Sequence, residues 1–145
     1  MTDRSPIERL ADVLVPKSLN EFRKIFHDAE AKFYVDGEGR GVIKIIENGY
    51  LVGMEFIETE TSWESKKRIW EYYVVLVNKC RLVIYVPDEH ADRARLKMLE
   101  FNMHWLNYYL VYSYDEDLHI EKIGRPRMLS GSPLRAAVSP LSGYL

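Results

Sequence analysis

The residues best suited to chemistry in this sequence are four carboxylates on either side of a strand hairpin. Glu58 and Glu60 end the apolar segment that begins at Leu51, and Asp36 and Glu38 lie in a glycine-rich turn upstream. Carboxylates gathered in one place repel one another unless a divalent cation, a basic neighbour or partial protonation neutralises them. A bound Mg²⁺, or Mn²⁺ in its place, can activate water for attack on a phosphodiester. The residue types therefore predict a metal site, with Asp36, Glu58 and Glu60 as ligands or base.

A hairpin signal indicates why these acids should meet. Asn48-Gly49 favours a type I′ turn, which needs positive φ at both positions, so Glu47 is expected opposite Tyr50. This register predicts three further pairs on one buried face: Ile45 with Val52, Ile43 with Met54, and Gly41 with Phe56. Glu58 continues the same face, followed by Glu60, so both carboxylates are expected where the buried face ends, beside the acidic turn.

Basic residues follow the predicted acid site. Lys66 and Lys67 stand in the first turns of the next expected helix, where either ammonium could orient a nucleophile or hold a phosphate. Together with Arg68, and with Arg125 and Arg127 near the C-terminus, they could form a local surface for phosphates. Such a patch would be needed for DNA, because a net charge of −2 gives no general attraction to polyanions. The alternative is that they are solvated charges, some of them paired with Glu58 and Glu60, which would stabilise the fold only weakly.

The pattern of apolar residues predicts a mixed α/β domain with the element order α-β-β-β-α-β-α-β. Pro16 is expected to end a first short helix, and Ser18 and Thr61 begin capping-box patterns that predict helix starts. The expected helices span residues 7–15, 18–29, 61–78 and 89–105, and the expected strands 32–35, 41–46, 51–61, 81–86 and 108–114, with a further edge strand at 118–123. The strand–helix–strand unit over 51–86 implies a right-handed crossover and a parallel strand pair.

Composition limits the class of protein. The chain has 145 residues, 47% of them apolar, which suits one domain over residues 1–123 with a tail at 124–145 rich in Pro, Ser, Gly and Arg. Cys80 is the single cysteine, so no internal disulfide can form and a reducing compartment is favoured. The first residues show no secretory pattern, and the longest apolar run, residues 72–77, is too short to cross a bilayer. A cytoplasmic protein without membrane contact is the expectation.

Residues 18–114 resemble the PD-(D/E)XK, or restriction-endonuclease-like, nuclease superfamily in element order and in the acidic strand end. In that resemblance Asp36 matches the first aspartate of the family motif, Glu58 the second acid, and Glu60 the position of the strand lysine. Lys66 or Lys67 would stand in for that lysine, which some members carry on the next helix. The resemblance implies a restriction-endonuclease-like mixed sheet and Mg²⁺-dependent cleavage of DNA.

Three functions are therefore expected from the sequence. The first is a metal-dependent nuclease domain that hydrolyses phosphodiester bonds in DNA. The second is a catalytically inactive nuclease-like domain that binds nucleic acid or protein, which the missing strand lysine favours. The third is a homodimeric interaction protein with the tyrosine pairs, Tyr72-Tyr73 and Tyr108-Tyr109, in the subunit interface.

Overall fold

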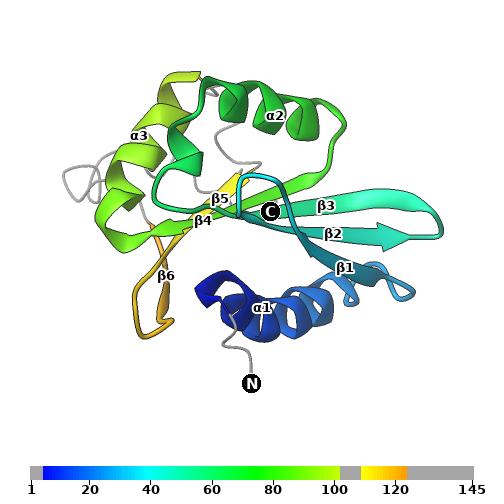
Figure 1. Cartoon of the computed structure of the whole chain (residues 1–145). Coiled ribbons are helices and arrows are strands. Elements are labelled where there is room, and N and C mark those ends of the chain that lie inside the picture. Colours follow the sequence, from blue (N-terminus) through cyan, green and yellow to red (C-terminus); the bar gives the residue numbers. More distant parts are fainter. Residues whose placement is uncertain (1–4, 102–108, 124–145) are drawn as a thin grey trace, which may run out of the picture.

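A computed structural model describes residues 5–101 and 109–123 of the chain, in three layers. A six-stranded mixed sheet carries helix α1 on one face and helices α2 and α3 on the other (Figure 1). The helices are α1 (Pro6–Phe22), α2 (Lys66–Val77) and α3 (Ala91–Phe101), with short 3₁₀ turns η1 (Ser62–Glu64) and η2 (Asp88–His90) before the last two. The strands are β1 (Glu30–Val35), β2 (Gly41–Glu47), β3 (Tyr50–Ile57), β4 (Arg81–Pro87), β5 (Tyr109–Tyr114) and β6 (Ile120–Lys122). The predicted mixed α/β class is confirmed.

The strands lie side by side in the order in which they occur in the chain. β1, β2 and β3 form an antiparallel meander, β3, β4 and β5 are parallel, and β6 returns antiparallel to β5. The predicted parallel pair across a helix is confirmed by β3, α2 and β4. Helices α2 and α3 connect parallel strands, so β3, β4 and β5 run in the same direction. Their carboxyl ends therefore lie at the same end of the sheet.

The N-terminal helix is continuous, which corrects the predicted break at Pro16. Ser5 caps α1 in a capping box with Glu8, and the helix runs through Pro16 to Phe22. The expected cap at Ser18 does not form, because the hydroxyl of Ser18 points inward and donates to Glu55 at 2.8 Å. Burial of the apolar face of α1 against β1 and β2 outweighs the helical hydrogen bond that a proline cannot donate.

The hairpin between β2 and β3 forms at the predicted residues but with a shifted register. Asn48 and Gly49 have φ of 51° and 83°, as a type I′ turn requires, and Glu47 pairs with Tyr50. A bulge beside Ile45 and Ile46 then moves every later pair by one residue. The observed pairs are Ile45 with Gly53, Ile43 with Glu55, and Gly41 with Ile57, so the three predicted pairs are wrong.

The start of the helix after β3 also differs from the prediction. β3 ends at Ile57 rather than at residue 61, and the Thr61 side chain forms no cap. A 3₁₀ turn comes first, and Ser65 caps α2 by accepting from the amide of Lys67. The predicted end of the last helix, residues 102–105, and the tail with Arg125 and Arg127 lie outside the described residues.

Two apolar cores hold the layers together. One lies between the sheet and α2 and α3 and includes Phe56, Tyr72 and Ile84, and the other lies between the sheet and α1 and includes Leu10, Ile43 and Ile57. Among the described helices, none is long and apolar enough to cross a membrane.

Candidate functional site

The predicted acids do converge, but around an arginine. Arg40, at the end of the turn between β1 and β2, has an exposed fraction of only 2%. Its guanidinium donates from Nε to Asp36 at 2.6 Å, from Nη1 to Glu58 at 2.9 Å, and from Nη2 to Glu71 of α2. The same group lies over the ring of Phe56, 4.5 Å from the centroid. One cation thus forms ion pairs with carboxylates from a turn, a strand end and a helix.

Glu58 is the most deeply buried of these acids, with no exposed surface. Its Oε1 accepts from the hydroxyl of Ser62 at 2.6 Å, and its Oε2 accepts from Arg40 and from the hydroxyl of Tyr72. Its backbone carbonyl accepts from the hydroxyl of Tyr114 at 2.5 Å. Both carboxylate oxygens therefore already bind protein donors, in a place that water does not reach.

A second buried arginine extends the network toward the surface. Arg68 has an exposed fraction of 2% and donates to Glu38 in the turn and to Glu71, one turn along α2, at 2.8 Å. Glu38 and Glu71 are themselves partly exposed, with 40% and 37% of their side-chain surface open. We call Arg40, Arg68 and the carboxylates that they bind the arginine–carboxylate network.

Electrostatics keep the centre of this network ionised. Burial disfavours the charged guanidinium of Arg40, but the carboxylates around it, Glu71 first, raise its pKa above the ordinary value. Burial likewise acts to raise the pKa of Asp36, yet the hydrogen bonds from Arg40 and from the Glu38 amide outweigh it, and the pKa is lowered. Burial, followed by the Glu58 charge, raises the pKa of Tyr72, so its hydroxyl stays a donor.

The structure brings together only part of the predicted site. Asp36 and Glu58 meet through Arg40, whereas Glu60 is exposed beyond the strand end and lines a separate groove. Lys66 and Lys67 are exposed, and neither ammonium has an ion pair among the described residues. Metal binding and catalysis by these residues stay predictions.

Arg68 was predicted to contact phosphates, but it lies inside the arginine–carboxylate network with 2% of its surface exposed. Arg40 and Glu71 were not predicted at all, since Arg40 lies in a glycine-rich turn and Glu71 lies between Trp70 and Tyr72 in an apolar part of the helix. An arginine directly before the buried strand β2 was the available signal, because such a cation needs carboxylates nearby.

A large groove lies at the carboxyl ends of the three parallel strands. It has a volume of about 620 Å³ and is open to solvent. The lining residues come from the start of α1, the last residues of β4 and β5, and the segments after β3, β4 and β5: Pro6, Ile7, Thr59, Glu60, Pro87, Asp88, Glu89, Tyr114, Asp115 and Glu116. Five of these ten are carboxylates and none is a lysine or arginine. We call this feature the acidic groove.

One acid of the groove belongs to a small cluster in the loop between β5 and β6. The ligand atoms of Asp115, Asp117 and His119 lie within 4.8 Å of one another. They are used within the loop, because Asp115 accepts from the backbone amides of Asp117 and His119 and contacts the His119 ring at 3.2 Å. The backbone donors, His119 first, lower the pKa of Asp115. Exposed clusters of this kind are common without a metal, so we assign none here.

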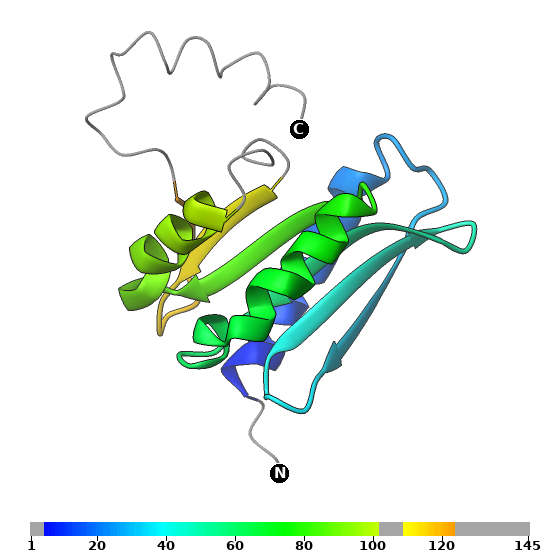
Figure 2. The same cartoon turned by 90° about the horizontal axis from the view of Figure 1, so that it is seen from above.

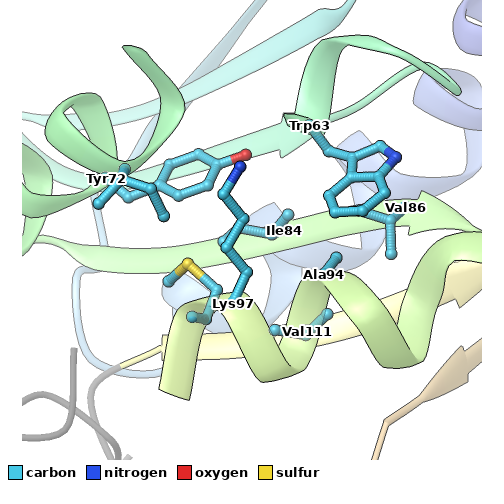
Figure 3. A pocket seen from close by; sticks show the side chains of 9 residues that line it. Trp63, Tyr72, Ile84, Val86, Ala94, Lys97 and Val111 are labelled. Atoms are coloured by element: carbon cyan, nitrogen blue, oxygen red, sulfur yellow. The ribbon is translucent and has the colours of Figure 1, made fainter. Parts of the chain in front are cut away.

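A second cavity lies inside the molecule, between α2, α3 and the sheet (Figure 3). Its volume is about 10 Å³, which is space for about one water molecule. Lys97 reaches between Tyr72 and Trp63 in this view and donates to the backbone carbonyl of Glu64 at 2.9 Å. The ring of Trp63 lies 5.3 Å from the guanidinium of Arg93. This cavity is a packing gap and cannot admit a substrate.

The core on the α1 face contains an isolated carboxyl group. Glu55 has an exposed fraction of 2%, and its Oε1 accepts from Ser18 at 2.8 Å and from the hydroxyl of Tyr85 at 2.9 Å. Burial raises its pKa, and the two hydroxyl donors lower it only in part. Glu55 was not predicted, since only the Phe56 side of β3 was expected to be buried, whereas α1 covers the other side, where Glu55 lies opposite Ile43.

Comparison of the chain with known protein families, with characterised proteins and with solved structures finds no match. The acidic groove and the arginine–carboxylate network are the two features of the described residues that bear on function.

Proposed function

We propose that this chain is a non-catalytic binding domain that takes a basic segment of a partner protein into the acidic groove. The observation that supports this most directly is the composition of the groove. Five carboxylates line about 620 Å³, and the lining residues that the structure describes include no lysine or arginine. A cavity of this size suits a small molecule or a few residues of a peptide.

Charge determines the class of ligand. Neighbouring carboxylates repel each other by about 1 kcal/mol per pair at 4 Å in water, and a cationic ligand relieves that repulsion. The groove also offers apolar surface from Pro6, Ile7 and Pro87 and the ring of Tyr114. Arginine or lysine side chains interspersed with apolar ones match both features. A nucleic acid would bring phosphates toward carboxylates, which the same charges oppose.

The position of the groove supports a ligand site as well. The carboxyl ends of the three parallel strands lie at the same end of the sheet, so side chains from several segments converge on the groove. Glu60, Asp88 and Glu116 come from the segments that follow β3, β4 and β5. Each of these segments directly follows a strand in the covered centre of the sheet.

A titration with defined peptides tests this proposal. The probe is a fluorescent peptide of alternating arginine and leucine, and the control peptide carries glutamate in place of arginine. The variant E89K/E116K replaces two exposed groove acids, and D28K changes one exposed acid elsewhere. We expect binding of the basic peptide that falls with salt, weakened about tenfold or more by E89K/E116K and less than about threefold by D28K. Equal affinity for both peptides, or no effect of E89K/E116K, would overturn the proposal.

The second candidate is the metal-dependent nuclease, favoured by the convergence of Asp36, Glu38, Glu58 and Glu71. Against it stands the pairing of all four acids with Arg40 and Arg68, and both oxygens of Glu58 are occupied by protein donors. Calorimetric titration with Mn²⁺ or Mg²⁺, together with incubation with mixed DNA substrates, separates the two candidates. Metal binding that E58Q abolishes, with DNA cleavage, would favour the nuclease.

A further inference from the structure

β1 ends the sheet with one long side unpaired among the described residues. The amide of Asp36 donates to the carbonyl of Arg40 at 3.0 Å, which closes the hairpin with β2. Hydrogen bonding alternates along an antiparallel strand, so even-numbered residues of β1 bond to β2. The amide and carbonyl groups of Ala31, Phe33 and Val35 therefore point outward. A six-residue edge of this kind is a template for another strand.

The side chains of β1 also leave apolar surface uncovered. Tyr34 and Val35 have exposed fractions of 44% and 45%. Tyr34 is exposed because no described helix covers β1 on its face of the sheet. Helix α2 crosses that face beside β2 (Figure 2). On the other face Ala31 and Phe33 pack only partly against the α1 core.

The charge of Lys32 on β1 favours a partner that places an aromatic ring beside this side chain. Lys32 lies directly opposite Lys44 of β2, a like-charge pair that weakens a sheet. Lys44 sits 5.4 Å from the ring centroid of Tyr34, whereas no described aromatic ring or carboxylate contacts Lys32. An aromatic ring supplied across the open edge would stabilise Lys32 by the same kind of contact.

We propose that β1 pairs antiparallel with β1 of a second copy of this chain, about a two-fold axis at Phe33. Phe33 then lies opposite Phe33 of the partner subunit, and Ala31 lies opposite the partner's Val35. Lys32 lies opposite the partner's Tyr34. The two sheets join into one continuous sheet across the axis, on the side of the molecule away from the β5–β6 edge. The proposal does not depend on the acidic groove.

The choice of a second copy follows from self-complementarity. In this register the three outward residues of each strand pair completely, so every outward amide meets an outward carbonyl. A two-fold axis at Lys32 would instead place two lysines opposite each other beside Lys44, and an axis at Ala31 would leave Val35 unpaired. The axis at Phe33 also covers both exposed side chains, Tyr34 and Val35.

Sedimentation of the full chain over a range of concentrations tests the pairing. V35P removes an outward amide without removing a bond to β2, and proline is tolerated at such edge positions. We therefore expect a concentration-dependent dimer in the wild type and a monomer for V35P, with the same far-ultraviolet circular dichroism. A wild type that stays monomeric at all concentrations, or a V35P variant that dimerises like the wild type, would overturn the proposal.

Two variants with opposite charges at position 34 test the register. Y34K places a lysine opposite Lys32 of the partner subunit and should weaken the dimer about tenfold or more, whereas Y34E places a carboxylate there and should retain it. Equal weakening by both variants would contradict this register. A31C/V35C gives an independent readout, because opposed residues of a bonded pair lie within disulfide range and four residues along one strand do not. We expect disulfide-linked dimers on oxidation, and their absence in a dimer that V35P disrupts would also contradict the register.

Discussion

At the scale of single residues, Arg40 stabilises the buried carboxylate of Glu58 by an ion pair. Glu58 has no exposed surface, and Arg40 is its only cationic partner among the described residues. Removal of one member of a buried ion pair leaves an uncompensated charge, which costs about 3–5 kcal/mol. We expect R40M to lower the free energy of unfolding by about that amount, measured by urea denaturation.

The double variant R40M/E58Q supplies the control. Neutralising both groups removes the uncompensated charge, so most of the loss should be recovered. K67M, which changes an exposed lysine without an ion pair, should alter the free energy of unfolding by less than about 0.5 kcal/mol. An R40M variant as stable as K67M would show that the network does not depend on its central cation.

Glu55 makes a prediction about pH. Its pKa in the folded state is raised by burial above the ordinary value of 4.5, so the folded state holds this proton more tightly than the unfolded state. The stabilisation is complete below the unfolded pKa and is lost as the pH rises through the folded pKa. Relative to wild type, E55Q should therefore gain stability as the pH increases above about 4.5, in denaturation series at matched pH values.

E55A tests whether the hydrogen bonds at Glu55 matter apart from the proton. Alanine leaves a cavity and deprives Ser18 and Tyr85 of their acceptor, so E55A should be less stable than E55Q by about 2–4 kcal/mol at every pH. If the difference in free energy of unfolding between E55Q and wild type does not change with pH, the pKa of Glu55 is not raised in the folded state.

At the scale of elements, α1 tolerates a proline at a cost that a substitution can reveal. Pro16 lies in the third turn of a seventeen-residue helix and cannot donate a hydrogen bond to the preceding turn. Its side chain is exposed, so alanine loses no packing. We expect P16A to raise the free energy of unfolding by about 1–2 kcal/mol, since the restored bond outweighs the greater freedom of the unfolded chain. A P16A variant less stable than wild type would indicate that the proline ring makes a contact that alanine loses.

Local sequence signals predicted most of the elements, while long-range contacts decided their details. The β2–β3 turn could be predicted because Asn48-Gly49 determines its own backbone geometry. The bulge beside Ile45 could not be predicted, since it depends on packing under α1: a side chain at Gly53 would collide with Phe22. Glu58 was still placed on the correct face, because Phe56 and Glu58 share a face whatever the register of β2.

The candidate site was predictable only as a group of acids. Asp36 and Glu58 follow from strand order, which brings the β1–β2 turn beside the end of β3. Their cationic partners could not be predicted, because these contacts join residues far apart in the sequence. The main example is the ion pair of Arg40 with Glu71 of α2. Glu60 was expected beside Glu58, but β3 ends at Ile57, so strand alternation no longer applies to it.

At the scale of the whole molecule, the sheet differs between its centre and its edges. β3, β4 and β5 are parallel and covered on both faces, whereas β1 and β6 each pair with one strand. The acidic groove is built on the covered centre, and the proposed dimer contact lies on the open edge. Ligand binding and dimer formation should therefore be independent, with peptide affinity unchanged by V35P within about twofold. A larger change would show that the two surfaces communicate.

Amide hydrogen exchange tests this division within single strands. Amides of β3, β4 and β5 should exchange most slowly, because they open only with the core. In β1 the amides of Lys32 and Tyr34 bond to β2, so their protection should not depend on protein concentration. The amides of Ala31, Phe33 and Val35 point outward and should exchange quickly in dilute protein but slowly in concentrated protein. If these three amides exchange quickly at every protein concentration, β1 is an unpaired edge strand. The ammonium of Lys32 is then stabilised by water and not by a ring of a partner subunit.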